Sequence, residues 1–231
     1  RQGYANMESL KLDGVVSLLN RVPALRRMIF RGPSVALCSM GGVGSTALAR
    51  HIGSIADKTV REHAYSPAVY NDETKIKLGY VFGNPYNSVL SVFRRGYQSM
   101  HAKAMNANSD TPAADLKNMS IEAYLERGID EFRLERQLDN WLNPELTRHP
   151  IILIKYEELA TSIDEVLAFF DCDKPFEVRT RKSSWRDQPA AIVAGLEKMY
   201  GGFNERVNAM PAVTVVEPHP VVNKEVAVSH G

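Results

Sequence analysis

The chain has 231 residues, a formal net charge of +1 and a hydrophobic content of 44%. This length and composition suit a globular protein with a sizeable core. The near-zero charge gives no reason to expect nucleic acid or an acidic membrane as a partner. No run reaches the roughly 18 apolar residues of a membrane span. The first residues lack the apolar stretch of a signal peptide, so we expect a cytoplasmic location.

Strands and helices alternate along most of the chain. Apolar runs and alternating patterns predict strands at 34–38, 58–61, 75–82 and 150–156. Helical spacing predicts helices at 7–30, 45–56, 88–105, 120–140, 162–170 and 190–203. This order predicts an α/β fold in which helices flank a doubly wound parallel sheet. Ligands of such sheets bind at the carboxyl ends of the strands.

The chain divides into three parts. Residues 1–33 form a helical lead-in, 34–210 an α/β domain, and 211–231 a tail that we expect to be disordered because it has no periodicity. Within the domain, Asn87 and Ser120 are the predicted caps of two helices. The polar stretch 107–114 is rich in helix breakers and is typical of a mobile loop near a site.

The stretch 34–52, SVALCSMGGVGSTALARHI, is the most informative part of the sequence. A short apolar strand leads into three glycines within four residues, and Ser45 and Thr46 stand where a helix begins. Glycines let backbone N–H groups approach an anion, and the positive end of a helix dipole favours negative charge there. The pattern therefore favours phosphate binding over an ordinary strand–helix turn. The ATP-binding loop pattern has a lysine where this chain has Ser45.

Metal chemistry has little support in the sequence. The two cysteines, Cys38 and Cys172, form neither a disulfide framework nor a metal motif. None of the six histidines pair at metal-ligand spacing, so we expect a site that works without a metal.

Four short motifs occur in a fixed order between residues 34 and 187. They are 44–46 (GST) after the first strand, 83–91 (GNPYNSVLS) after the third, 156–159 (YEEL) after the fourth, and the basic 181–183 (RKS). In this order and on these elements the chain resembles the sulfotransferase family, whose members use 3′-phosphoadenosine 5′-phosphosulfate (PAPS). The resemblance implies a P-loop-like nucleotide-binding core.

The resemblance also implies an activity and a set of site residues. The activity is transfer of a sulfuryl group from PAPS, as co-substrate, to a hydroxyl or amine of a small-molecule or carbohydrate acceptor. His63 stands where the family has its general base, which takes the acceptor proton. The residues that would hold the 5′-phosphosulfate are Gly41, Gly42, Val43, Gly44, Ser45 and Thr46, and those that would hold the 3′-phosphate are Ser91, Arg181 and Lys182.

The chain departs from the family pattern at two cations. Gly42 stands at the place of the loop lysine, and Gly83 at the place of the arginine before Asn84. Arg94 or Arg95 is a candidate to replace that arginine at the 3′-phosphate. The missing cations leave a second interpretation open, a nucleotide-binding or interaction module that keeps the fold without catalysis. A P-loop kinase acting on a small molecule is a third, less favoured interpretation.

Overall fold

A five-stranded sheet in the order β2-β1-β3-β4-β5 forms the centre of the protein. The computed structural model describes residues 34–54, 58–107, 113–179 and 184–219. The strands are β1 (Ser34–Ser39), β2 (Lys58–Glu62), β3 (Ile76–Phe82), β4 (Ile151–Lys155) and β5 (Val213–Val216). The first four are parallel and β5 is antiparallel to β4. The predicted α/β class with a mostly parallel sheet is thereby confirmed.

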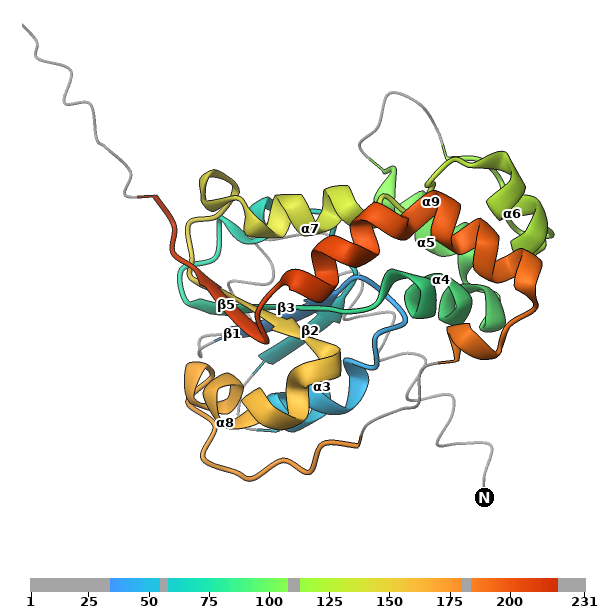
Figure 1. Ribbon diagram of the computed structural model, residues 1–231. Coiled ribbons are helices and arrows are strands. Elements are labelled where there is room, and N and C mark those ends of the chain that lie inside the picture. The colour runs from blue at the N-terminus through green and yellow to red at the C-terminus, as the bar shows by residue number, and fades with distance from the viewer. Residues whose placement is uncertain (1–33, 55–57, 108–112, 180–183, 220–231) are drawn as a thin grey trace, which may run out of the picture.

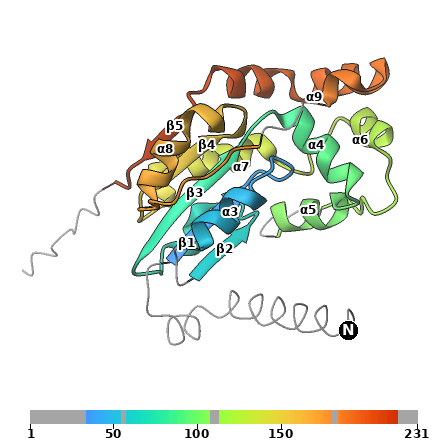
Figure 2. The same ribbon diagram turned by 90° about the horizontal axis from the view of Figure 1, so that it is seen from below.

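Helices cover both faces of the sheet, with α3 and α8 on one face and α7 and α9 on the other (Figures 1 and 2). The α-helices are α3 (Thr46–Gly53), α4 (Pro85–Arg94), α5 (Gln98–Met105), α6 (Ile121–Arg127), α7 (Leu134–Leu142), α8 (Leu159–Phe169) and α9 (Ala190–Ala209). Short 3₁₀ turns are η1 (Pro67–Tyr70), η2 (Pro144–Leu146), η3 (Tyr156–Glu158) and η4 (Trp185–Asp187). The predicted lead-in 1–33, with its helix at 7–30, lies outside the described residues.

The helix predicted over 88–105 is two helices joined by a sharp turn. Its first part, α4, begins earlier because Asn84, and not Asn87, is the N-cap: the Asn84 side chain accepts a hydrogen bond from the Asn87 amide at 3.0 Å. It ends where Gly96 adopts φ +68°. There the Gly96 amide donates to the Phe93 carbonyl and the Tyr97 amide to the Val92 carbonyl, which satisfies the helix end. The chain then turns into α5.

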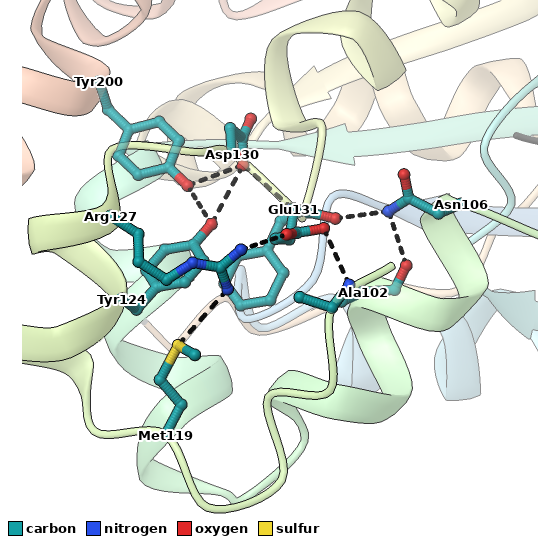
Figure 3. A network of polar contacts seen from close by, with 10 residues as sticks. Ala102, Asn106, Met119, Tyr124, Arg127, Asp130, Glu131 and Tyr200 are labelled. Atoms are coloured by element: carbon teal, nitrogen blue, oxygen red, sulfur yellow. Dashed lines mark hydrogen bonds and ion pairs between the residues drawn. The ribbon is translucent and has the colours of Figure 1, made fainter. Parts of the chain in front are cut away.

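The helix predicted over 120–140 is also interrupted, near the half-buried Asp130, whose polar contacts are drawn in Figure 3. Ser120 caps α6 as predicted, accepting from the Ala123 amide at 3.2 Å. Asp130 then accepts hydrogen bonds from the backbone amides of Phe132 and Leu134, and from the hydroxyl of Tyr200 in α9 at 2.7 Å. Burial raises the pKa of Asp130, and the Tyr200 hydrogen bond partly offsets this. Gly128, with φ +65°, ends α6, and the Asp130 carboxylate holds the start of α7 and ties it to α9.

The prediction of a disordered tail at 211–231 is wrong for Val213–Val216, which form β5. The buried ammonium of Lys155 donates to the carbonyl oxygens of Asn208 and Met210 at 2.9 and 3.0 Å and pairs with Glu158 at 2.6 Å. This fixes the end of α9 beside β4, so the short valine-rich segment that follows can add to the sheet edge. Four residues are too few for periodicity to reveal such a strand. Residues 220–231 lie outside the described part.

Gly79 in β3 allows close packing between the sheet and α8. A Cβ there would lie 2.6 Å from Leu37 Cδ1 and 2.8 Å from the Phe170 ring, whereas a Cβ on Gly202 in α9 would meet nothing within 4 Å. We expect Gly79→Ala to lower the free energy of unfolding by about 1–3 kcal/mol through overpacking. Gly202→Ala, the matched control, should leave it unchanged or raise it by up to about 1 kcal/mol. Urea unfolding of both variants measures the difference, and equal effects would contradict this packing.

Candidate functional site

The ends of β1 and β2 place a histidine beside the start of the glycine loop. Cys38 pairs in register with Glu62, so the next residue of each strand, Ser39 and His63, come together. The His63 Nδ1–H is shared between the Ser39 carbonyl oxygen at 2.9 Å and Ser39 Oγ at 3.1 Å. Because a carbonyl oxygen only accepts, Nδ1 carries the proton and the neutral ring has its lone pair on Nε2. This tautomer is the one that can take a proton through Nε2.

A buried network holds the backbone next to His63. The Ala64 carbonyl oxygen accepts hydrogen bonds from Gln137 Nε2 at 2.8 Å and from Trp141 Nε1 at 3.0 Å, both from α7. The Gln137 Oε1 in turn accepts from the Tyr80 hydroxyl of β3 at 3.0 Å. All three side chains are fully buried. Since buried polar groups cost free energy when unpaired, this network fixes the chain directly after His63.

The glycine loop, 40–45, is pressed against three other elements. Gly41, Gly42 and Gly44 have φ angles of +91°, +72° and +73°. A Cβ at Gly42 would lie 2.8 Å from the Ser88 carbonyl oxygen of α4, one at Gly41 2.8 Å from the His101 ring of α5, and one at Gly44 2.9 Å from the Tyr156 ring. The Ser88 hydroxyl also donates to the Gly41 carbonyl at 2.6 Å. Both the backbone and the space therefore require glycine in this loop.

The side chains of the loop have different roles. Val43 is buried in the hydrophobic core, so only its backbone can face a ligand. The Ser45 hydroxyl is buried and donates to Ser39 Oγ at 3.1 Å, and it makes no capping bond to α3. Thr46, the first residue of α3, is half-buried at the surface of the loop. A direct side-chain contact to a bound phosphate therefore falls to Thr46 more readily than to Ser45.

A cavity of about 310 Å³ opens beside the loop and collects the predicted site residues. Four stretches of chain line it: the loop and start of α3, the end of β2, α4 and α5. The lining residues are Gly41, Gly42, Ser45, Thr46, His63, Ser91, Val92, Arg95, Tyr97, Met100 and His101. The Ser91 hydroxyl is buried and has no hydrogen-bond partner among the described residues. Of the predicted site residues, those that line this cavity are Gly41, Gly42, Ser45, Thr46, His63 and Ser91. Val43 does not line it, and Gly44 borders a different cavity.

Two residues that line the cavity add to the predicted site. The sequence left open whether Arg94 or Arg95 contributes, and it gave no role to His101. Arg95 is an exposed cation at the cavity, whereas its neighbour Arg94 does not line it. His101 is 4% exposed, and its ring lies edge-on to His63 with centroids 5.4 Å apart. Burial, and after it the neighbouring His63, lower the pKa of His101 from 6.5 to about 3, and a hydrogen bond with the Met40 backbone offsets only part of this shift. His101 is therefore neutral near pH 7.

The second and third motifs meet at the ends of β3 and β4. The Asn84 amide donates to Glu157 Oε1 at 2.8 Å. A Cβ on Gly83 would lie 2.8 Å from Glu157 Oε2, so this carboxylate fills the space beside the glycine that replaces the family arginine. The two motifs are linked to each other, but neither Gly83 nor Glu157 lines the cavity that contains Ser91.

The predicted phosphate ligands Arg181 and Lys182 lie outside the described residues. The chain that follows them does reach α4, since the amides of Ser184 and Trp185 both donate to Asn87 Oδ1 at 3.2 Å. The Trp185 ring packs edge-on against Tyr86 with centroids 5.1 Å apart. The basic motif is thus followed by a segment anchored at the first turn of α4.

A second cavity, of about 500 Å³, lies on the other side of the glycine loop. Gly44 borders it together with His51 of α3, Tyr156, Phe176 and Arg179. His51 Nε2 is bonded to the Lys174 carbonyl oxygen at 2.9 Å, and the His51 and Phe176 rings are tilted with centroids 4.9 Å apart. The glycine loop therefore borders both cavities, and the second is walled partly by aromatic rings.

The buried, neutral His101 should make the protein sensitive to acid. Its pKa of about 3 in the folded state lies below the ordinary value of 6.5, so protons bind the unfolded chain first as the pH falls. Its contribution to stability is full above about pH 6.5 and is lost progressively toward pH 3. Between pH 7 and pH 5 the unfolding free energy should fall by about 2 kcal/mol more in the parent than in His101→Phe. Equal pH dependence in urea unfolding would contradict the burial of a neutral ring.

Comparison with models of known protein families gives no match, and comparison with curated proteins gives none either. Among the described residues, no group of three or more His, Cys, Asp or Glu side chains could hold a metal ion. In the same part of the chain, no helix is both long and apolar enough to cross a membrane. The chemistry of the site therefore has to be inferred from its own residues.

Proposed function

We propose that this chain is a sulfotransferase with a P-loop-like core, which moves a sulfuryl group from PAPS to a hydroxyl or amine of an acceptor. The observation that carries the proposal is the cavity of about 310 Å³, which unites the glycine loop, His63 and Ser91 from three separate stretches of chain. These are the positions that the family resemblance assigns to the phosphosulfate, the base and the 3′-phosphate. If the short motifs resembled the family only by chance, there would be no reason for these residues to line the same cavity.

The anion side of the cavity consists of the loop, Thr46 and Ser91. The loop leads directly into α3, whose N-terminal amides and dipole favour an anion. Ser91 adds a buried hydroxyl that has no partner among the described residues and can donate to a phosphate oxygen. The resemblance adds Arg181 and Lys182, whose placement lies outside the described part.

His63 is the proposed general base. It is exposed at the cavity, and its Nδ1–H bond to Ser39 leaves the lone pair on Nε2. The acceptor oxygen attacks sulfur in line, the bond between sulfur and the bridging oxygen breaks, and 3′-phosphoadenosine 5′-phosphate leaves with that electron pair. The acceptor proton passes to His63 Nε2. No redox change occurs and no metal takes part in these steps.

Arg95 is the proposed source of positive charge. The loop packs so closely on α4 that a lysine at position 42 would collide with the Ser88 carbonyl oxygen, which explains the glycine there. Arg95, at the end of α4, brings a guanidinium to the same cavity from another direction. Charge at the leaving oxygen develops in the transition state, and a cation that lies close to it lowers the barrier.

Titration with 3′-phosphoadenosine 5′-phosphate, followed by calorimetry, tests the donor side. We expect the parent to bind, and Arg95→Gln to bind roughly tenfold more weakly because a charge-assisted hydrogen bond is lost. Arg94→Gln is the matched control, since Arg94 is adjacent, exposed and outside the cavity lining. Lower ionic strength should widen the gap between the two variants. Absence of binding by the parent at millimolar ligand would rule the proposal out.

Two further substitutions separate the donor from the acceptor. Thr46→Ala should weaken binding of the nucleotide by about 1.5–3 kcal/mol if Thr46 bonds a charged phosphate. His63→Ala should leave nucleotide affinity nearly unchanged while lowering turnover roughly 10²–10⁴-fold. Turnover is measured as sulfated product formed from PAPS and a mixed panel of alcohols and amines. If His63→Ala abolishes nucleotide binding instead, His63 is a structural residue and not the base.

A nucleotide-binding or interaction module without catalysis is the second candidate. The carboxylate of Glu157 beside Gly83 favours it, because a negative charge stands where the resemblance places a phosphate-binding arginine. This candidate gives binding of 3′-phosphoadenosine 5′-phosphate with no sulfated product from any acceptor in the panel. Detection of such a product from the parent, and its loss in His63→Ala, would decide for the enzyme.

A further inference from the structure

The acceptor side of the cavity is dominated by His101, which no motif of the sequence singles out. Its ring is held on three sides: edge-on to His63, edge-on to Phe132 at a centroid distance of 5.4 Å, and against Gly41, where a Cβ would lie 2.8 Å from its Cε1. With 4% of its surface exposed, the residue has little freedom to turn. The direction of its ring nitrogens is therefore a fixed property of the site.

One of those nitrogens has no partner. His101 forms a hydrogen bond with the Met40 backbone, and Nε2 has none with any described residue. The Met40 amide already donates to the Val81 carbonyl oxygen, so the Met40 group that bonds His101 is its own carbonyl oxygen. Nδ1–H is therefore the donor to Met40, and the lone pair of the neutral ring is on Nε2. A buried acceptor left without a hydrogen bond costs about 1–3 kcal/mol, which makes it a feature that needs a reason. His101 is one of the residues that line the cavity, so a bound ligand is a source from which the buried Nε2 could gain this bond.

The chemistry of this nitrogen differs from that of Ser91. A hydroxyl can donate to a phosphate oxygen, but the lone pair of a neutral imidazole repels one. The low pKa of His101 keeps the ring neutral throughout the physiological range. His101 therefore accepts an O–H or N–H group and does not bind the anionic donor. The Ser91 hydroxyl therefore suits a phosphate, whereas the neighbouring His101 nitrogen suits an alcohol or an amine.

We propose that His101 binds a second hydrogen-bond donor on the acceptor molecule, so that the preferred acceptor is a vicinal diol or an amino alcohol. The inference rests on the proposed function, in which His63 takes the proton of the reacting hydroxyl. A hydroxyl has a single hydrogen, so it cannot donate to both imidazoles. A substrate that satisfies both rings, whose centroids are 5.4 Å apart, carries two donors on neighbouring carbons.

The mouth of the cavity indicates what carries these donors. Tyr97 and Met100 line it with 51% and 61% of their surfaces exposed, beside the buried Val92. Exposed apolar side chains at a concave site favour an apolar body on the ligand. A small saturated or aromatic ring with adjacent hydroxyl or amino groups matches both the polar floor and the apolar rim.

Histidine ¹⁵N NMR of the parent protein with cis-cyclohexane-1,2-diol tests the proposal directly. The His101 Nε2 resonance should move upfield on addition of the diol, as expected when a ring nitrogen accepts a hydrogen bond, and much less on addition of cyclohexanol. trans-2-Aminocyclohexanol shows whether an amine serves as the second donor. His149 is an internal reference, because its Nε2 is also buried without a partner among the described residues but does not line the cavity. Equal shifts with diol and mono-alcohol, or no shift of His101, would overturn the proposal.

His101→Phe keeps a ring of similar size and removes the acceptor, and His149→Phe is its matched control. Diol affinity relative to cyclohexanol should fall at least tenfold in the first variant and stay unchanged in the second. Retained preference in a folded His101→Phe protein would overturn the proposal, and the parent spectra decide it if that variant does not fold. Titration with 3′-phosphoadenosine 5′-phosphate is run alongside. Diol binding without nucleotide binding refutes sulfuryl transfer but supports the subsite, whereas nucleotide binding without diol binding refutes the subsite alone.

Discussion

Close packing of the glycine loop is the constraint on which the rest of the site depends. Three elements press on the loop at positions 41, 42 and 44, and at each a Cβ would come within 2.9 Å of a neighbouring atom. Contact this close leaves the backbone itself as the surface that a ligand meets. It also sets the distance of α4 and α5 from the end of β1. The His101 ring can lie against the loop because Gly41 has no side chain to keep it away.

Close packing also limits the positions from which a cationic side chain can reach the cavity. A long cationic side chain has no room in the loop at Gly42, and Glu157 occupies the space beside Gly83. Positive charge among the described lining residues comes from Arg95, at the far end of α4. Each of the two departures from the sulfotransferase pattern thus coincides with a close contact at the glycine, with Ser88 at Gly42 and with Glu157 at Gly83. In the proposed function the cation is the exposed Arg95, whose field solvent and salt weaken more than they would in a closed loop.

The central strands and the loop were predictable because local signals define them. Apolar runs with a glycine or proline close to one end predict β1, β3 and β4 within two residues. The position of His101 was not predictable, since an unbroken helix would carry it roughly 20 Å beyond Ser88. Instead the chain turns at Gly96. The residues that then contact His101 are His63, Phe132 and Gly41, which are distant in the sequence. β5 depends likewise on Lys155, whose buried ammonium needs distant carbonyl groups. Pattern reading detects neither kind of long-range requirement.

The hydrogen-bonded series Ser45–Ser39–His63 connects the loop to the proposed base through the protein alone. A ligand that accepts a hydrogen bond from the Ser45 hydroxyl would remove the hydrogen bond that Ser45 donates to Ser39. The electrostatic environment of the His63 ring, which contacts Ser39, would then change. Coupling of this kind is reciprocal: whatever the loop does to the proton affinity of His63, protonation of His63 does to the affinity of the loop for its anion. Under the proposed function, the hydroxyl groups of Ser45 and Ser39 would therefore couple anion binding at the loop to protonation of His63.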